Sequence, residues 1–162
     1  MRVAAVVLLM LFVSGIAQAQ ERTFGDWYVV RSDNGDMVAA TLENGTQYML
    51  GYRCFKELGR CAHVLVADID CTDGQMYPVL VNSDYSSLSM NALCENNTST
   101  GKAELVLSEF DSIHKIMEKS NIVGFAIPMA DGLFKVVRFS LRGANEAMQY
   151  ASDTAGTAAI YK

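Results

Sequence analysis

The chain has 162 residues, of which 13 are Lys or Arg and 18 are Asp or Glu, so its formal net charge at pH 7 is −5. This length suits one globular domain. The mildly acidic balance argues against binding nucleic acid or anionic lipid by charge alone. Only two prolines occur, and no low-complexity run or internal repeat suggests a linker or a second domain.

The N-terminus has the pattern of a cleavable export signal. Arg2 supplies a positive charge, an unbroken apolar run extends from Val3 to Val13, and Ala17 and Ala19 place small residues where a signal peptidase reads them. A helix over this run is about 16 Å long, too short for a bilayer core of about 30 Å. We therefore expect a signal peptide over residues 1–19 and a single globular domain over residues 20–162, located in the periplasm or secreted.

Most of the mature chain is predicted to form short strands separated by turns. Aromatic and β-branched residues predict strands at 24–30, 37–42, 46–52, 62–69, 76–81 and 88–94. Asn44-Gly45 tolerates the positive φ angles of a tight turn and therefore predicts a hairpin. Pro78 cannot donate a ladder hydrogen bond, which favours an edge position for its strand or a strand that begins there.

The C-terminal third is expected to mix helices and strands. Ser108 is a suitable N-cap for a helix over 109–119, whose apolar residues recur at helical spacing. Further strands are expected at 122–127 and 133–141, followed by a short helix at 144–151 and a loose tail at 152–162. Together these elements predict a mainly β fold, an antiparallel β-sandwich with one or two short peripheral helices.

The four cysteines predict two disulfides, because their number is even and the chain is exported. Four cysteines allow three pairings, and the sequence does not decide between them. We favour Cys54–Cys61 with Cys71–Cys94, since the first bond would staple the two limbs of a hairpin. A zinc site is the alternative, but the spacings do not match paired Cys-x-x-Cys hooks.

Residues that could carry chemistry are few and isolated. His63 and His114 are the two histidines, and no local signature such as Gly-x-Ser-x-Gly marks a nucleophile to pair with either. The acidic stretch Asp68–Gly74 resembles a calcium loop, but its register differs from that of an EF-hand, which favours a solvated turn. Arg142-Gly143 fits a tight turn before a helix. We expect no catalytic residue, cofactor or metal.

Two short segments resemble a known family. Phe24-Gly25-Asp26-Trp27, placed directly after the export signal, resembles the start of the bacterial invasion-associated locus B proteins, and the stretch Phe139–Met148 is similar to their ending. The middle segment Tyr52–Cys94 does not match, and Val30-Arg31 stands where the family usually carries a Cys. The resemblance implies an exported β-sandwich of the Gram-negative envelope, linked to host-cell invasion, and it implies no catalytic residues.

The sequence therefore favours a non-catalytic interaction protein that binds another protein of the envelope or the host. Exposed aromatics suit such a surface, because they supply rigid contact area at low entropic cost. Tyr85, in a turn, is the first candidate, followed by Phe55 and Tyr77. Two alternatives remain open. One is a small inhibitor of a lysozyme-like hydrolase, which an acidic surface would suit, and the other is a periplasmic enzyme whose site is assembled from dispersed residues.

Overall fold

A computed structural model describes residues 22–97, 102–129 and 131–157. The predicted signal peptide with its cleavage site, and the last five residues of the predicted tail, lie outside these ranges. In the described part no helix is both long and apolar enough to cross a membrane.

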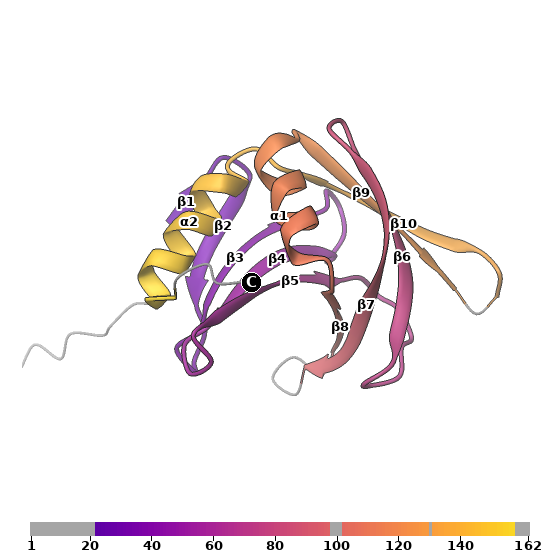
Figure 1. The fold of residues 1–162 in the computed structure, drawn as a ribbon, viewed down its shortest axis with the longest axis horizontal. Coiled ribbons are helices and arrows are strands. Elements are labelled where there is room, and N and C mark those ends of the chain that lie inside the picture. Colours follow the sequence, from indigo (N-terminus) through magenta and orange to yellow (C-terminus); the bar gives the residue numbers. More distant parts are fainter. Residues whose placement is uncertain (1–21, 98–101, 130, 158–162) are drawn as a thin grey trace, which may run out of the picture.

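Ten strands form one antiparallel sheet (Figure 1). They are β1 (Arg22–Phe24), β2 (Trp27–Arg31), β3 (Met37–Leu42), β4 (Met49–Phe55), β5 (Arg60–Val66), β6 (Met76–Ser83), β7 (Ser87–Asn97), β8 (Lys102–Leu107), β9 (Ile122–Pro128) and β10 (Phe134–Ser140). Their order across the sheet is β1-β2-β3-β4-β5-β8-β7-β6-β9-β10. Most neighbours in the sheet are also neighbours in the chain, because short turns connect them.

The sheet curves strongly, so that its two ends approach each other (Figure 1). Near this approach the indole N–H of Trp27 donates to the backbone oxygen of Ser140 at 3.0 Å, and the Arg138 amide donates to the Glu43 carboxylate at 2.8 Å. The described residues of β1 and β10 do not pair as strands. The predicted mainly β fold is therefore confirmed, with both halves of the sandwich belonging to one continuous sheet.

Two helices lie on the concave side of the sheet, α1 (Phe110–Lys119) and α2 (Ala144–Ala155) (Figure 1). They supply part of the core through the buried residues Ile113, Ile116, Met117, Ala144, Ala147, Met148 and Ala151. The strands alternate as expected, as β9 shows by burying Val123, Phe125 and Ile127 and turning the residues between them outward.

The start of α1 corrects the predicted cap. The helix begins at Phe110 after Glu109, without a side-chain cap hydrogen bond. Ser108, predicted as the N-cap, instead donates its hydroxyl to the backbone oxygen of Asn91 at 2.6 Å. That hydroxyl therefore ties the chain to the end of a strand pair and does not reach the first turn of the helix.

The single strand predicted at 24–30 is also wrong. Gly25 adopts a positive φ of 57° and turns the chain, so β1 and β2 pair as a hairpin with Phe24 opposite Trp27. Glycine adopts such angles without steric cost. The apolar run hides this turn because the residues on both sides of it are strand formers.

Pro78 lies on β6, which stands between β7 and β9, so the predicted edge position is wrong for the strand as a whole. Yet β6 pairs with β9 only from Leu80 to Ser83, while its pairing with β7 runs from Met76 to Asn82. Pro78 therefore occupies the half of β6 that has one partner, where a missing N–H costs no ladder hydrogen bond.

The C-terminal segment is ordered further than predicted. α2 continues to Ala155, four residues beyond its predicted end. After it, Thr157 is buried and its hydroxyl lies 3.2 Å from the sulfur of Cys61. The first part of the predicted tail is therefore packed against the core.

Candidate functional site

The two segments that carry the family resemblance pack against each other. Besides the bond from the Trp27 indole, the backbone N–H of Asp26 donates to the backbone oxygen of Arg142 at 2.9 Å. The Asp26 carboxylate accepts the Ser140 hydroxyl at 2.6 Å and the Arg142 guanidinium at 2.5 Å. These bonds hold the first hairpin against the end of β10 and the start of α2.

Charge and backbone geometry both indicate that this junction is structural. The hydrogen bond from Arg142, supported by Ser140, lowers the pKa of Asp26 to about 2, and the same contact raises the pKa of Arg142. Gly143 has a φ of 88°, and a Cβ atom there would lie 2.0 Å from the backbone oxygen of Phe24. Arg142-Gly143 thus forms the tight turn expected from the sequence. The Arg142 side chain is exposed and is held by its ion pair with Asp26.

The two histidines, isolated in the sequence, meet between the sheet and α1. His63 on β5 is completely buried, and its Nε2 atom lies 3.3 Å from Nδ1 of His114 on α1. Tyr52 and Phe110 surround them, with the Phe110 and His114 rings stacked at a centroid distance of 5.3 Å. The Nε2 atom of His114 faces the Glu118 carboxylate at 3.6 Å.

Burial disfavours the charged form of both rings. Loss of solvent, reinforced by the adjacent His114, places the pKa of His63 well below its usual value of 6.5. Burial also lowers the pKa of His114, although Glu118 and Asp111 act in the opposite direction. At neutral pH the pair is therefore uncharged. The pair lines none of the pockets described below, so its geometry is that of a packed polar contact.

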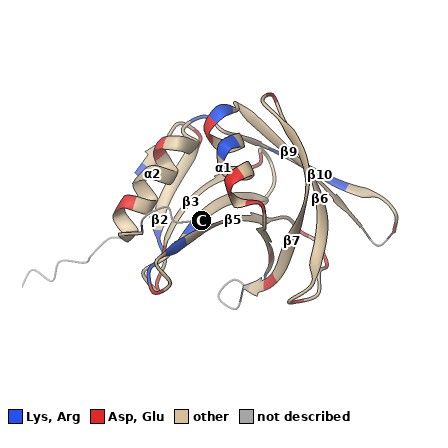
Figure 2. Ribbon diagram, viewed as in Figure 1, with Lys and Arg blue, Asp and Glu red and all other residues tan. Residues whose placement is uncertain are grey.

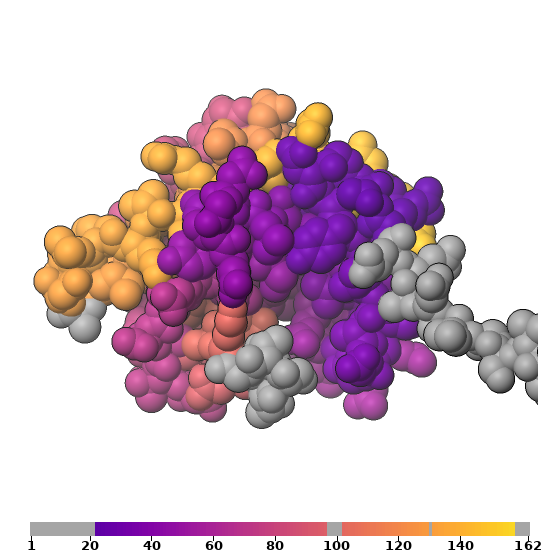
Figure 3. Space-filling view, turned by 180° about the vertical axis from the view of Figure 1, so that it is seen from behind, coloured from indigo at the N-terminus to yellow at the C-terminus, as the bar shows by residue number. Residues whose placement is uncertain are grey.

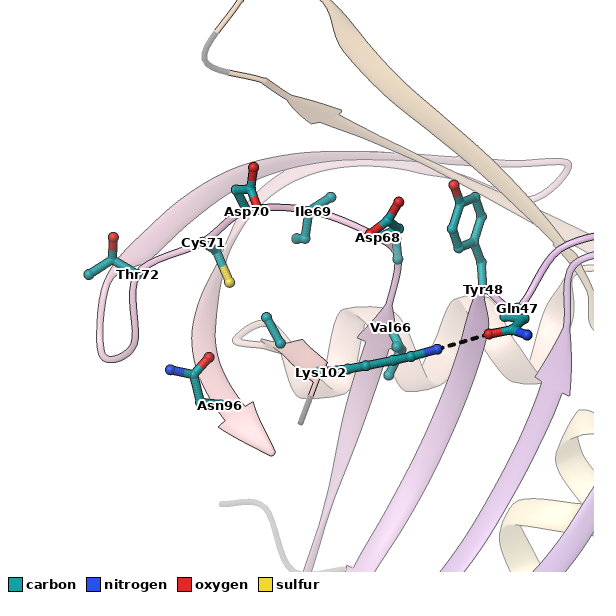
Figure 4. Close-up of a pocket in the computed structure, with 12 residues that line it drawn as sticks. Gln47, Tyr48, Val66, Asp68, Ile69, Asp70, Cys71, Thr72, Asn96 and Lys102 are labelled. Carbon is teal, nitrogen blue, oxygen red and sulfur yellow. Dashed lines mark hydrogen bonds between the residues drawn. The ribbon is translucent and has the colours of Figure 1, made fainter. Parts of the chain in front are cut away.

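A pocket of about 670 Å³, which we call the β8 pocket, lies where β5 and β8 diverge (Figure 4). Its wall includes the acidic stretch after β5 together with the N-terminal end of β8. The pocket is lined by Gln47, Tyr48, Val66, Ala67, Asp68, Ile69, Asp70, Cys71, Thr72, Asn96, Lys102 and Ala103. The Lys102 ammonium donates to the Gln47 amide oxygen at 3.1 Å across its floor (Figure 4).

This pocket has mixed chemistry. Asp68 and Asp70 are exposed, as a solvated acidic turn predicts, and Lys135 reaches over the Tyr48 ring at 4.8 Å to donate to the backbone oxygen of Asp68. Its size falls within the range of small-molecule sites. In the described ranges no group of three His, Cys, Asp or Glu is arranged to hold a metal ion. The pocket is lined by acidic and basic side chains together, Asp68 and Asp70 with Lys102, so its charge does not favour one class of ligand.

Both disulfides favoured by the sequence are present. Cys54 and Cys61 lie directly opposite each other on β4 and β5. Cys71, on the pocket wall, is bonded to Cys94 on β7. This second bond ties the loop between β5 and β6 to the sheet, so it fixes one side of the pocket.

A different surface gathers exposed apolar side chains. On the outward face of β6, β9 and β10, Leu80, Ile122, Phe134 and Val136 are 49%, 47%, 57% and 52% exposed. Leu80, Ala126 and Val136 form one row across the three strands, and Asn82, Gly124 and Arg138 form the next. We call the four exposed residues, with Gly124 and Ala126 as their floor, the outer patch.

The small floor residues hollow the outer patch into a shallow groove of about 490 Å³. Strands β6 and β9 carry no charged residue, and β10 contributes only Lys135 and Arg138 (Figure 2). The hairpin of β9 and β10 projects from the body of the molecule (Figure 3). The groove is lined by two charged residues, Asp84 in the turn after β6 and Arg138, which stands beside Gly124 in the row between Val136 and Ile122.

The three aromatic residues proposed from the sequence do not form one surface. Tyr85 is 46% exposed in the turn between β6 and β7, next to Asp84 of the groove. Tyr77 is half-buried near the other end of β6, and its hydroxyl accepts the Thr72 amide at 2.9 Å. Phe55 is half-buried at the end of β4 beneath the Arg53 guanidinium. Only Tyr85 adjoins the outer patch, and binding by any of the three stays a prediction.

Comparisons with known proteins give a likeness in structure alone. No protein-family profile matches the sequence, and no curated protein matches it. A crystal structure of invasion associated protein B from Bartonella henselae is similar, with a TM-score of 0.59 and 11% identity over 82% of this chain and 96% of that chain. The chain therefore shares the fold of that protein, which confirms a distant structural relationship to the family suggested by the sequence segments.

Proposed function

We propose that this protein is an exported, non-catalytic interaction protein of the bacterial envelope, and that it binds a partner protein through the outer patch. The observation that carries the proposal is the gathering of four half-exposed apolar side chains over three adjacent strands, with Arg138 as the one charged side chain on the outward face of these strands. A contiguous apolar patch with a polar rim is typical of protein interaction sites.

The strands that carry the outer patch differ from β7 in the residues on their outward faces. β9 is apolar on both faces, and β10 places Phe134 and Val136 on its outward face, where water would favour polar residues. The outward residues of β7, in contrast, include Ser87, Ser89 and Asn91. Covering one large apolar side chain is worth about 1.5–3 kcal/mol, so a partner seated on the outer patch would gain from several such contacts.

Export is supported by the N-terminal pattern and by the two disulfides, since such bonds persist in oxidising compartments. The expected mature chain begins at Gln20. Intact-mass measurement on protein recovered from the periplasm or the medium should show the loss of residues 1–19. A mass that retains these residues would contradict export by cleavage.

The likeness to a protein named for its association with invasion supports placing the partner in the envelope or in the host. A non-catalytic role is supported by the histidines, because each ring faces the other and neither lines the β8 pocket or the groove of the outer patch. An enzyme remains the competing function, and turnover of any substrate in a panel of envelope hydrolase substrates would favour it.

The proposal is tested by photocrosslinking in the exporting cell. A photoreactive residue replacing Val136 in the outer patch should form a discrete adduct with another protein. The control is Glu57, an exposed residue in the turn between β4 and β5, away from the outer patch. Identical adducts from both positions, or none from Val136, would argue against this surface.

A further inference from the structure

The hydrogen bond between His63 and His114 connects α1 to β5, in addition to the packing of the buried Ile113, Ile116 and Met117. The two facing nitrogens are 3.3 Å apart, and a neutral imidazole has one donor and one acceptor nitrogen. One ring must therefore donate and the other accept. The Nδ1 atom of His63 is buried and has no hydrogen-bond partner among the described residues.

The unpaired Nδ1 atom of His63 decides which of the two rings donates the hydrogen bond. If His63 accepted through Nε2, its Nδ1 would carry a buried N–H without an acceptor, which costs about 1–3 kcal/mol. The favoured arrangement has His63 donating through Nε2 to Nδ1 of His114. The Nε2–H of His114 then points toward the Glu118 carboxylate, 3.6 Å away. The neutral pair is thus satisfied at its shared contact.

Protonation of the pair, by one proton or by two, disrupts this hydrogen bond. A proton added to Nδ1 of His114 removes the acceptor, so His63 must move its own proton to the orphaned Nδ1 atom. A second proton leaves two charged rings facing each other with N–H groups at 3.3 Å. Neither state can be relieved by water at His63, because that ring is 0% exposed.

The neighbouring groups do not compensate for this cost. Tyr52 on β4 contributes a ring, and α1 contributes the Phe110 ring and the carboxylates of Glu118 and Asp111. These carboxylates favour protonation of His114, but burial outweighs them and its pKa is lowered. Within the described ranges, no charged side chain of β4, β5 or α2 acts on either ring.

We propose that His63 and His114 form an acid-sensitive latch, which holds α1 on the sheet at neutral pH and releases it when the surroundings acidify. α1 has ten residues, too few to remain helical in water by itself. Its release would expose its apolar face and the aromatic cluster below it. Acid would thus open a second apolar surface, on the concave side and separate from the outer patch.

The sign of the effect follows from proton linkage. Both rings have a lowered pKa in the folded protein, so the released state binds more protons. The latch is therefore complete above about pH 6.5 and weakens as the pH falls below that value. Each proton taken up on release changes the opening equilibrium by at most tenfold per pH unit, so two protons change it by at most a hundredfold.

Hydrogen exchange read by mass spectrometry on the mature protein tests the latch. Between pH 6.5 and 5.5, protection of residues 110–119, corrected for intrinsic exchange, should fall tenfold or more, while β6 and β7 keep theirs. The double variant His63→Leu/His114→Gln should remove this pH dependence. If it does not fold, His114→Gln alone should at least lower the slope, since it removes one of the two titrating rings.

Three results would overturn the latch. They are flat protection of α1 in the natural protein, an unchanged slope in a folded variant, and parallel loss of protection in α1, β6 and β7. The last result would show that acid unfolds the whole domain. Lys115→Gln, an exposed change on the same helix, is the matched control and should keep the pH dependence.

Discussion

Gly143→Ala is expected to destabilise the fold by about 3 kcal/mol or more. The new Cβ atom would lie 2.0 Å from the backbone oxygen of Phe24 and 2.4 Å from its carbonyl carbon. Both are backbone atoms of the first hairpin, so neither can turn aside as a side chain would. The positive φ of 88° adds strain for any residue with a side chain. Urea unfolding of the natural protein and the variant at neutral pH measures the difference in the free energy of unfolding.

Gly156→Ala is the matched control at the other end of α2. Gly156 also has a positive φ, of 67°, but within the described ranges nothing beyond its chain neighbours lies within 4 Å of the position that a Cβ atom would take. Its substitution should cost only about 1 kcal/mol, which reflects the backbone conformation alone. Equal losses in the free energy of unfolding for the two variants would show that the first hairpin does not pack closely against the start of α2, contrary to the junction described above.

Removal of the Cys71–Cys94 disulfide is expected to have the second large effect. The bond closes a chain segment with a separation of 23 residues, and constraining such a loop stabilises a domain by about 3 kcal/mol in the chain-entropy treatment. The variant Cys71→Ala/Cys94→Ala should therefore melt about 10 °C lower. Calorimetry of the oxidised natural protein and the variant gives the comparison.

The effect should also be local. Because Cys71 lies on the wall of the β8 pocket, the loop between β5 and β6 should lose exchange protection before the rest of the sheet. Residues of β9 and β10, on the far side of β6, serve as the internal reference. An unchanged melting temperature would mean that hydrogen bonds, such as that from the Asn96 amide to Asp73, already hold the loop.

Much of the fold follows from local pattern, and its failures have physical causes. Alternating apolar residues and the Asn44-Gly45 turn were sufficient to predict the hairpin of β3 and β4, although β4 begins at Met49, three residues after its predicted start at Thr46. Ser108 failed as a cap because the helix begins one residue later than predicted, after Glu109, and the Ser108 hydroxyl points to the backbone oxygen of Asn91, which is distant in sequence. Gly25 was not recognised as a turn because strand-forming residues flank it on both sides, although Gly25-Asp26 forms the two-residue turn between Phe24 and Trp27.

The candidate surfaces were harder to predict because they depend on long-range pairing. β10, with the sequence FKVVRFS, is apolar at several positions on both faces, so periodicity predicts a strand without showing which side meets water. The outer patch exists only because β6, β9 and β10 become neighbours. In the same way, His63 and His114 are separated by 51 residues, and nothing local indicates that they meet.

The outer patch as a partner-binding surface is tested most directly with the partner obtained by crosslinking. Binding of the purified partner to Leu80→Asp and to Ser89→Asp is measured by calorimetry. Both residues are exposed and lie opposite each other on adjacent strands, so both variants should fold. We expect Leu80→Asp to weaken binding tenfold or more, about 1.4 kcal/mol, and Ser89→Asp to leave it within twofold. Equal affinities for the two variants would contradict the proposed surface.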